Sequence, residues 1–146
     1  MSGIRQTGEK NLMFFSGRAY PELAAEVASH LGVDTTPTTL RDFANGEIYA
    51  RYLESVRGCD AFVMQSHTEP INKWVMEQLI MVDALKRASA ERITVIMPFF
   101  GYARQDKKGR GREPITARLM ADLFKTAGAD RLMSIDLHTS QIQGFF

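Results

Sequence analysis

Residues 93–115 read ITVIMPFFGYARQDKKGRGREPI, and this stretch carries the strongest fold signal in the chain. Its first five residues, 93–97, are mostly β-branched or large and apolar, which predicts a buried strand. Five Lys and Arg side chains and two glycines then follow within residues 104–112. In an α/β sheet, the loops after buried strands gather at one edge and often carry the binding groups. The stretch therefore predicts a strand that delivers a cationic loop to a ligand-binding edge.

Strand and helix signals alternate on both sides of this stretch. Short apolar runs predict strands at 12–16, 61–65 and 131–136, and helical spacing predicts helices at 20–31, 71–88 and 116–127. We expect an α/β fold with a mainly parallel sheet flanked by helices. Thr116 should cap the last of these helices. The expected buried positions of the second and third helices are Val75, Met76, Leu79, Ile80, Val82, Leu119, Met120, Leu123, Phe124 and Ala127.

A β-hairpin is expected outside this alternation. Residues 38–43 and 48–52 have strand-like composition and flank the tetrapeptide Ala44-Asn45-Gly46-Glu47. Asn-Gly between two such runs is a strong hairpin signal. The hairpin should project from the main sheet as a flap. The ligand-binding edge of the main sheet should hold three polar loops, at 16–18, 101–113 and 136–143.

Length and composition limit the class of protein. The chain has 146 residues, 45% of them hydrophobic and 24% charged, with a formal net charge of +1, which is ordinary for one globular domain. The balanced charge argues against a partner as broadly anionic as a nucleic acid. Cys59 is the one cysteine, which fits a reducing compartment such as the cytoplasm, and no apolar run has the length of a membrane span. The sequence ends on two phenylalanines, so we expect it to continue beyond residue 146.

The cationic loop at 104–112 has two interpretations. It can be a solvated basic loop, or a focused site in which Arg and Lys hold phosphate oxygens while glycines let the backbone approach them. Its position after a buried strand favours the second interpretation, with a polyphosphate such as a nucleotide as ligand. The chain has neither of the common glycine-rich nucleotide motifs, so any ATP site here is built without a P-loop.

Asp136 and His138 lie directly after the last predicted strand. Alternation places them on one side of the backbone, where they could simply hydrogen-bond or could contact Mg²⁺ beside bound phosphates. One carboxylate and one imidazole would be a partial set of ligands. The other histidines and Cys59 have no ligand-like spacing: His30 fits the end of a helix, and His67 lies in a polar loop without an evident partner.

Three motifs together resemble the ribose-phosphate pyrophosphokinases, also called phosphoribosyl pyrophosphate synthetases. They are FANGE at 43–47, YARQDKK at 102–108 and DLHTSQIQGFF at 136–146, and SVRG at 55–58 and GREPI at 111–115 add to them. The resemblance implies type I phosphoribosyltransferase-like domains, two in each subunit, and hexamers built from dimers. It also implies transfer of a pyrophosphoryl group from ATP to O1 of ribose 5-phosphate with Mg²⁺, giving phosphoribosyl pyrophosphate and AMP.

The resemblance also assigns residues. Phe43, Asn45, Gly46 and Glu47 correspond to a flap that contacts the adenine bound to a neighbouring subunit. Arg104 and Gln105 match a pair that contacts ATP, His138 matches a histidine that contacts metal and ATP, and Asp136 matches a nearby Mg²⁺ carboxylate. Many members have Asp where this chain has Asn45, whose amide can still hydrogen-bond a base. The positions that match a site for an effector phosphate, either ADP or phosphate itself, are Ser55, Arg57, Arg112 and Gln143.

Two parts of the family pattern are missing from the sequence. The loop that holds the ribose phosphate and the basic catalytic loop both lie in the family's second domain. We therefore expect residues 1–146 to be the amino-terminal, ATP-binding domain of a two-domain synthetase, with no catalytic residue of its own and no activity alone. The alternatives are a non-catalytic regulatory partner of such a synthetase or a nucleotide-binding assembly module.

Overall fold

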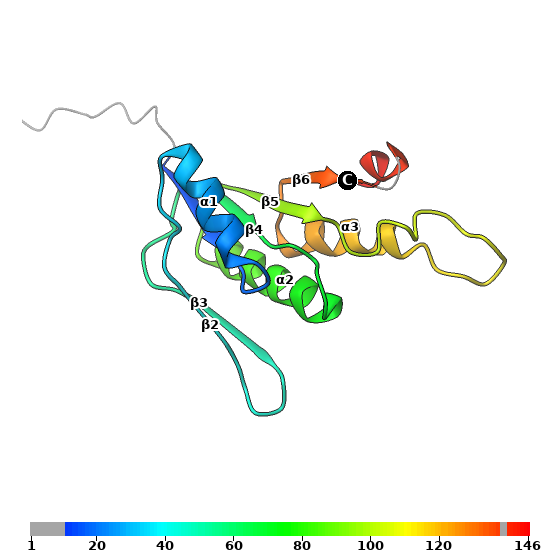
Figure 1. The fold of residues 1–146 in the computed structure, drawn as a ribbon, viewed down its shortest axis with the longest axis horizontal. Helices are drawn as coiled ribbons and strands as arrows, with labels where there is room; N and C mark the ends of the chain where they lie inside the picture. Colours follow the sequence, from blue (N-terminus) through cyan, green and yellow to red (C-terminus); the bar gives the residue numbers. More distant parts are fainter. Residues whose placement is uncertain (1–10, 138–139) are drawn as a thin grey trace, which may run out of the picture.

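The structure is a computed structural model that describes residues 11–137 and 140–146, and it contains two β-sheets. The main sheet has four parallel strands in the order β1-β4-β5-β6, formed by Leu12–Ser16, Asp60–Met64, Arg92–Phe99 and Arg131–Asp136 (Figure 1). Because these strands run in one direction, their carboxyl ends all lie at one edge. The loops expected at a ligand-binding edge therefore meet there, and the predicted fold class is confirmed.

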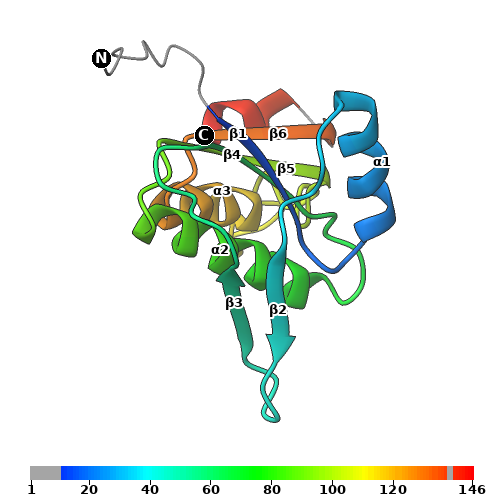
Figure 2. The ribbon, with the colours of Figure 1, turned by 90° about the vertical axis from the view of Figure 1, so that its left-hand side faces the viewer.

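Helices cover both faces of this sheet. Helices α2 (Ile71–Arg87) and α3 (Thr116–Ala127) lie together on one face, and α1 (Pro21–Leu31) lies on the other (Figure 2). Alternation along β1 serves both faces: Phe15 is buried toward α2, while Phe14 packs with Ala24 and Ala28 of α1. The larger core lies under α2 and α3 and includes Ile142 of the short 3₁₀ helix η1 (Ser140–Phe145).

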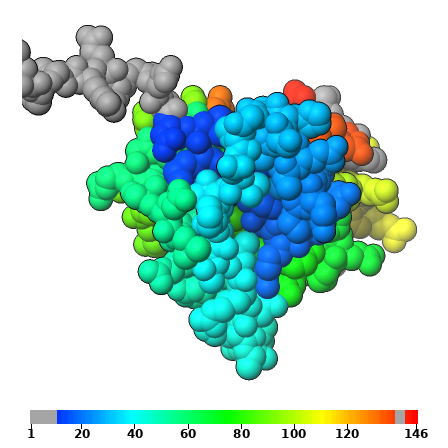
Figure 3. Space-filling view, turned by 60° about the vertical axis from the view of Figure 1, so that its left-hand side comes forward, coloured from blue at the N-terminus to red at the C-terminus, as the bar shows by residue number. Residues whose placement is uncertain are grey.

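The second sheet is the predicted hairpin. Strands β2 (Thr38–Asp42) and β3 (Ile48–Tyr52) pair antiparallel. The hairpin extends beyond the main body of the protein, and the space-filling view shows it as a protrusion (Figure 3). Its base is held by Tyr52, whose hydroxyl donates to the Met81 carbonyl of α2 at 2.7 Å and whose ring lies 4.6 Å from that of Phe15. Residues 43–47 at the tip are exposed and therefore accessible to another molecule.

Two helix predictions need correction. Met76, Leu119 and Leu123 were expected in the core, but they are exposed. In α2 the buried positions instead include two polar residues, Glu77 and Gln78. The apolar pattern therefore predicted the wrong buried face for this helix. Such a pattern treats every polar residue as exposed, although a polar side chain can be buried when its hydrogen bonds are satisfied inside the protein.

The predicted cap of α3 is also wrong. Thr116 is the first helical residue, Ile115 occupies the N-cap position, and no side chain caps the helix there. The backbone instead supplies a partner, because the Ala117 N–H donates to the Gln105 carbonyl at 3.0 Å. This bond joins the start of α3 directly to the cationic loop.

In the part of the chain that the structure describes, no helix has the length and apolar character needed to cross a membrane.

Candidate nucleotide site

The chain turns sharply after β5, within residues 100–105. The Ala103 N–H donates to the Phe100 carbonyl at 3.2 Å, and the Gln105 N–H donates to the Tyr102 carbonyl at 2.9 Å. Tyr102 adopts a left-handed backbone with φ of 69°, which bulky residues seldom do. The Tyr102 hydroxyl also donates to the Asn72 side chain at the start of α2. These contacts hold a tight turn that presents Arg104 and Gln105 at the edge of the sheet.

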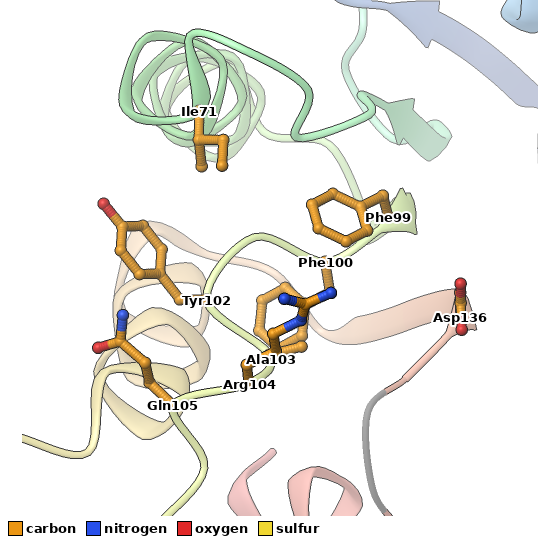
Figure 4. Close-up of a pocket in the computed structure, with 8 residues that line it drawn as sticks. All are labelled: Ile71, Phe99, Phe100, Tyr102, Ala103, Arg104, Gln105 and Asp136. Atoms are coloured by element: carbon orange, nitrogen blue, oxygen red, sulfur yellow. The ribbon is translucent and has the colours of Figure 1, made fainter.

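A cavity of about 490 Å³ opens beside this turn. Figure 4 shows its walls: aromatic and apolar groups surround a few polar ones, with Tyr102 and Gln105 on one side, Asp136 on the other and Arg104 between them. Ile71, at the start of α2, closes the wall near Tyr102. Pockets of this size, mostly apolar with a few convergent polar groups, suit small organic ligands. An aromatic wall could accept a flat ring, and Arg104 could neutralise an anionic group.

The remaining cations lie on an exposed extension of the same loop. Lys107, Lys108, Arg110 and Arg112 are all exposed. Glu113 turns back into the loop, and its carboxylate accepts the backbone N–H groups of Gly109 at 3.0 Å and Arg110 at 3.1 Å. These cations lie at the edge of the sheet where the sequence predicted them. Their side chains reach into solvent, where anions can approach them.

Asp136 is the residue here that could hold a metal ion. It ends β6, is exposed and lines the cavity that Arg104 also lines. His138, its expected companion, lies outside the described residues. Within residues 11–137 and 140–146, no three His, Cys, Asp or Glu side chains are grouped as metal ligands. A single carboxylate fits Mg²⁺ only when water or ligand oxygens complete the shell, which is the usual arrangement for Mg²⁺ bound to phosphates.

The flap residues occupy a separate region. The Gly46 N–H donates to the Phe43 carbonyl at 2.9 Å, and the Asn45 side chain accepts the Glu47 N–H at 3.1 Å. Gly46 has φ of 91°, a left-handed conformation that glycine adopts without strain. None of these four residues lines the cavity beside Arg104. They line a second, open cavity of about 770 Å³, which Lys73, Met76 and Ile80 of α2 also line.

Ion pairs fix the direction in which the flap leaves the body. Asp42, at the end of β2, accepts from Arg18 at 2.6 Å and from Lys73 at 2.7 Å. These two hydrogen bonds hold the pKa of the Asp42 carboxyl below its usual value, and the bond from Lys73 has the larger effect. Arg18 is itself held by Glu77, which is fully buried and accepts its backbone N–H at 2.9 Å and its Nε–H at 3.0 Å. The loop after β1, helix α2 and the flap are thus linked through charged groups.

The four residues assigned to an effector phosphate lie in three separate segments of the chain. Ser55 and Arg57 are exposed in the connection that precedes β4, at the amino end of the strands. Arg112 lies in the loop beyond the carboxyl ends, and Gln143 lies in η1 (Figure 1). One copy of this chain does not bring Ser55 and Arg57 together with Arg112.

Sequence reasoning missed several buried polar residues near this site. Gln65 follows β4, is buried, and accepts the Ala19 N–H at 3.0 Å. It packs so closely on Gly17 that a Cβ added there would lie 2.2 Å from its Oε1, so any other residue at that position would displace the Gln65 amide. His67, expected to have no evident partner, is fully buried and hydrogen-bonded. No local pattern could have revealed these partners, since they come from distant parts of the chain.

Comparison with known proteins gives a consistent result. Residues 12–128 match a family profile described as the N-terminal domain of ribose phosphate pyrophosphokinase. The chain is 75% identical to the ribose-phosphate pyrophosphokinase of Streptomyces coelicolor and 72% identical to that of Corynebacterium glutamicum, over 100% of this chain and 45% of each relative. It also resembles the crystal structure of phosphoribosylpyrophosphate synthetase from Mycobacterium smegmatis, with a TM-score of 0.93 and 72% identity, over 94% of this chain and 46% of that one. The chain thus spans less than half the length of these relatives.

Proposed function

The chain belongs to the ribose-phosphate pyrophosphokinase family, and on that premise we propose that it is the part of such an enzyme that holds ATP. The observation that carries this proposal is the cavity at the carboxyl edge, which Arg104, Gln105 and Asp136 line together with aromatic side chains. Arg104 would neutralise phosphate oxygens, and Gln105 would hydrogen-bond the nucleotide. His138 would contact the nucleotide or its metal from the segment after β6.

The reaction that we propose for the whole enzyme is transfer of a pyrophosphoryl group from ATP to O1 of ribose 5-phosphate, with AMP as the leaving group. Transfers at phosphorus depend on positioning and on neutralising developing charge. This chain offers such groups for one substrate only. Because it spans about 45% of its relatives, we place the ribose-phosphate site and the catalytic basic loop in a second domain outside this sequence.

Mg²⁺ is the cofactor that we propose. Asp136, with His138, would hold it at the mouth of the cavity, and the ion would supply positive charge against the phosphates. Asp136 shares the lining of that cavity with Arg104, and this placement supports a site shared by metal and nucleotide.

We further propose that the enzyme is a homo-oligomer, hexameric by resemblance. Phe43, Asn45 and Glu47 are exposed on a projecting hairpin and do not line the Arg104 cavity of their own chain, which supports a role at a neighbour's adenine. The separation of Ser55 and Arg57, at the amino ends of the strands, from Arg112, beyond their carboxyl ends, also supports an oligomer. A phosphate or ADP effector held by all four would bind between subunits.

Cys59 is buried and unpaired, which supports our proposal of a cytoplasmic enzyme.

Calorimetric titration with Mg-ATP tests the nucleotide site. We expect the chain to bind, and Arg104→Ala to weaken binding roughly tenfold or more, since a charge-assisted hydrogen bond is lost. Arg87→Ala is the matched control, because Arg87 is an exposed arginine paired with Asp83 on the far part of α2. Equal affinity in wild type and Arg104→Ala would overturn the assignment.

A second assay tests the division between domains. AMP release that depends on ribose 5-phosphate should be absent with this chain and present with the full-length enzyme. Aligning two reactants contributes roughly 7–11 kcal/mol to such reactions, and this chain is proposed to hold only one of them. Robust turnover by residues 1–146 alone would show that the chemistry lies here.

A further inference from the structure

His67 lies at the centre of a buried hydrogen-bond chain that reaches the turn beside the candidate nucleotide cavity. It follows β4 and has no exposed surface. Its Nδ1 receives the Gly101 N–H at 2.9 Å, and its Nε2 lies 2.8 Å from Oε1 of Gln78. Its own backbone N–H donates to the Phe99 carbonyl at 3.2 Å. One residue therefore holds the chain on both sides of Phe100, where β5 ends and the turn begins.

The partners determine the state of the ring. A backbone N–H can only donate, so Nδ1 must be an unprotonated acceptor, and Nε2 carries the hydrogen and donates to Gln78. The Gln78 amide then donates to the Val63 carbonyl at 3.0 Å and the Ile96 carbonyl at 3.2 Å. Both ring nitrogens of His67 and both polar atoms of the Gln78 amide therefore have hydrogen-bond partners. Burial agrees with this arrangement, since it lowers the pKa of His67 to about 4 and keeps the ring neutral.

The contact with Gly101 leaves little space. A Cβ added to Gly101 would lie 2.9 Å from Cγ2 of Ile71 and 3.0 Å from Cβ of His67. On its other side, the imidazole stacks on Phe124 of α3, with ring centroids 6.0 Å apart and planes 11° apart. The ring is thus held between α3 and the turn. Two residues that flank Gly101, Phe100 and Tyr102, line the cavity.

We propose that His67 is a positioning residue: its Nδ1 fixes Gly101, and through Gly101 the turn that presents Arg104 and Gln105 to the nucleotide. This inference rests on the proposed function for what the turn binds. Without the acceptor, a buried N–H at Gly101 would have no partner, and the turn would recover one only by moving toward solvent. A histidine that merely filled the core would place no such requirement on the turn.

A matched pair of substitutions separates these roles. Asn and Leu have nearly the same shape, but His67→Asn keeps an oxygen near the position of Nδ1, and His67→Leu removes the acceptor. We expect His67→Leu to weaken Mg-ATP binding roughly tenfold, and His67→Asn to stay within about threefold of wild type. Amide hydrogen exchange at Gly101 should accelerate in the Leu variant and remain slow in the Asn variant, with thermal unfolding measured for both.

Equal nucleotide affinity and equal Gly101 exchange in the two variants would overturn the proposal. If wild type fails to bind Mg-ATP, the proposed function fails by itself, and NMR shifts of residues 101–106 in the two variants then decide the positioning role. If His67→Leu does not fold, His67→Gln replaces it, because its amide reaches toward Gln78 and leaves Gly101 without an acceptor. Nitrogen NMR of wild type gives an independent check: a protonated Nδ1 would contradict the assignment.

Discussion

The flap and the turn after β5 are both functional candidates, but they are attached to the domain in different ways. The turn is held from beneath by His67, whose bonds are buried and formed between neutral groups. The flap is directed by Asp42, whose bonds to Arg18 and Lys73 lie at the surface. Buried neutral bonds leave an unpaired group when they break, whereas surface ion pairs exchange partners with water and salt. The turn should therefore be preorganised, and the flap should adapt to what it meets.

Acid should reveal the largest difference between the two regions. The pKa of His67 is lowered from 6.5 to about 4 by burial. The unfolded chain therefore binds a proton at higher pH than the folded one, so the stability that His67 contributes is complete above pH 6.5. It is lost as pH falls toward 4. Between pH 7.5 and pH 5, wild type should lose about 2 kcal/mol more of its unfolding free energy than His67→Asn.

Urea unfolding of both proteins at the two pH values measures this loss. The comparison of wild type with His67→Asn removes the contributions of all other titrating groups. Parallel pH dependence in the two proteins would contradict a buried neutral His67, and it would remove the main contrast between the turn and the flap.

Crowding the turn should give an effect of comparable size. Gly101→Ala places a methyl group 2.9 Å from Ile71 and 3.0 Å from His67, so atoms on both sides must move. We expect a destabilisation of about 1–3 kcal/mol, as for other overpacked sites, together with weaker nucleotide binding. Gly111→Ala is the control, since it lies in the same loop and a Cβ there would meet nothing within 4 Å. If both variants unfold at the same urea concentration, the turn is less closely packed than we describe.

Loosening the flap should have a smaller effect that depends on salt. Asp42→Asn weakens the bonds to Arg18 and Lys73, and exposed pairs of this kind contribute little to global stability. We expect amide exchange in β2 and β3 to rise by no more than about fivefold, and the difference from wild type to vanish at high salt. Asp83→Asn, which breaks the exposed pair with Arg87 on α2, is the control. A large, salt-independent loss of stability would mean that the flap is held as firmly as the turn.

The smallest effect is expected at the tip of the flap. Asn45 accepts the Glu47 N–H through its side-chain oxygen, and Asn45→Asp keeps that acceptor. The hairpin should therefore retain its turn, and the unfolding midpoint should remain within experimental error of wild type. Circular dichroism during thermal unfolding measures it, and a clear drop would show that charge beside Glu47 matters more than the hydrogen bond.

Sequence patterns located most of the elements, and the reasons are local. Short apolar runs mark β1 and β4, and the Asn45-Gly46 pair marks the turn between β2 and β3. The rule that ligand loops follow parallel strands also predicted Arg104 and Asp136 at one edge, and in the structure both line one cavity there. Each of these signals depends on neighbouring residues, so the chain itself carries them.

Tertiary contacts alone decided which polar residues are inside. Gln78 and Glu77 lie on the buried side of α2, while Met76 of the same helix is exposed. The apolar pattern had predicted that Met76 is buried. The reason is that a polar side chain can be buried once its partners are present, and those partners come from other elements. His67 meets Gly101 at a separation of 34 residues, so periodicity could not connect them. The fold brings them together, and this contact is the basis of our proposal that His67 positions the turn.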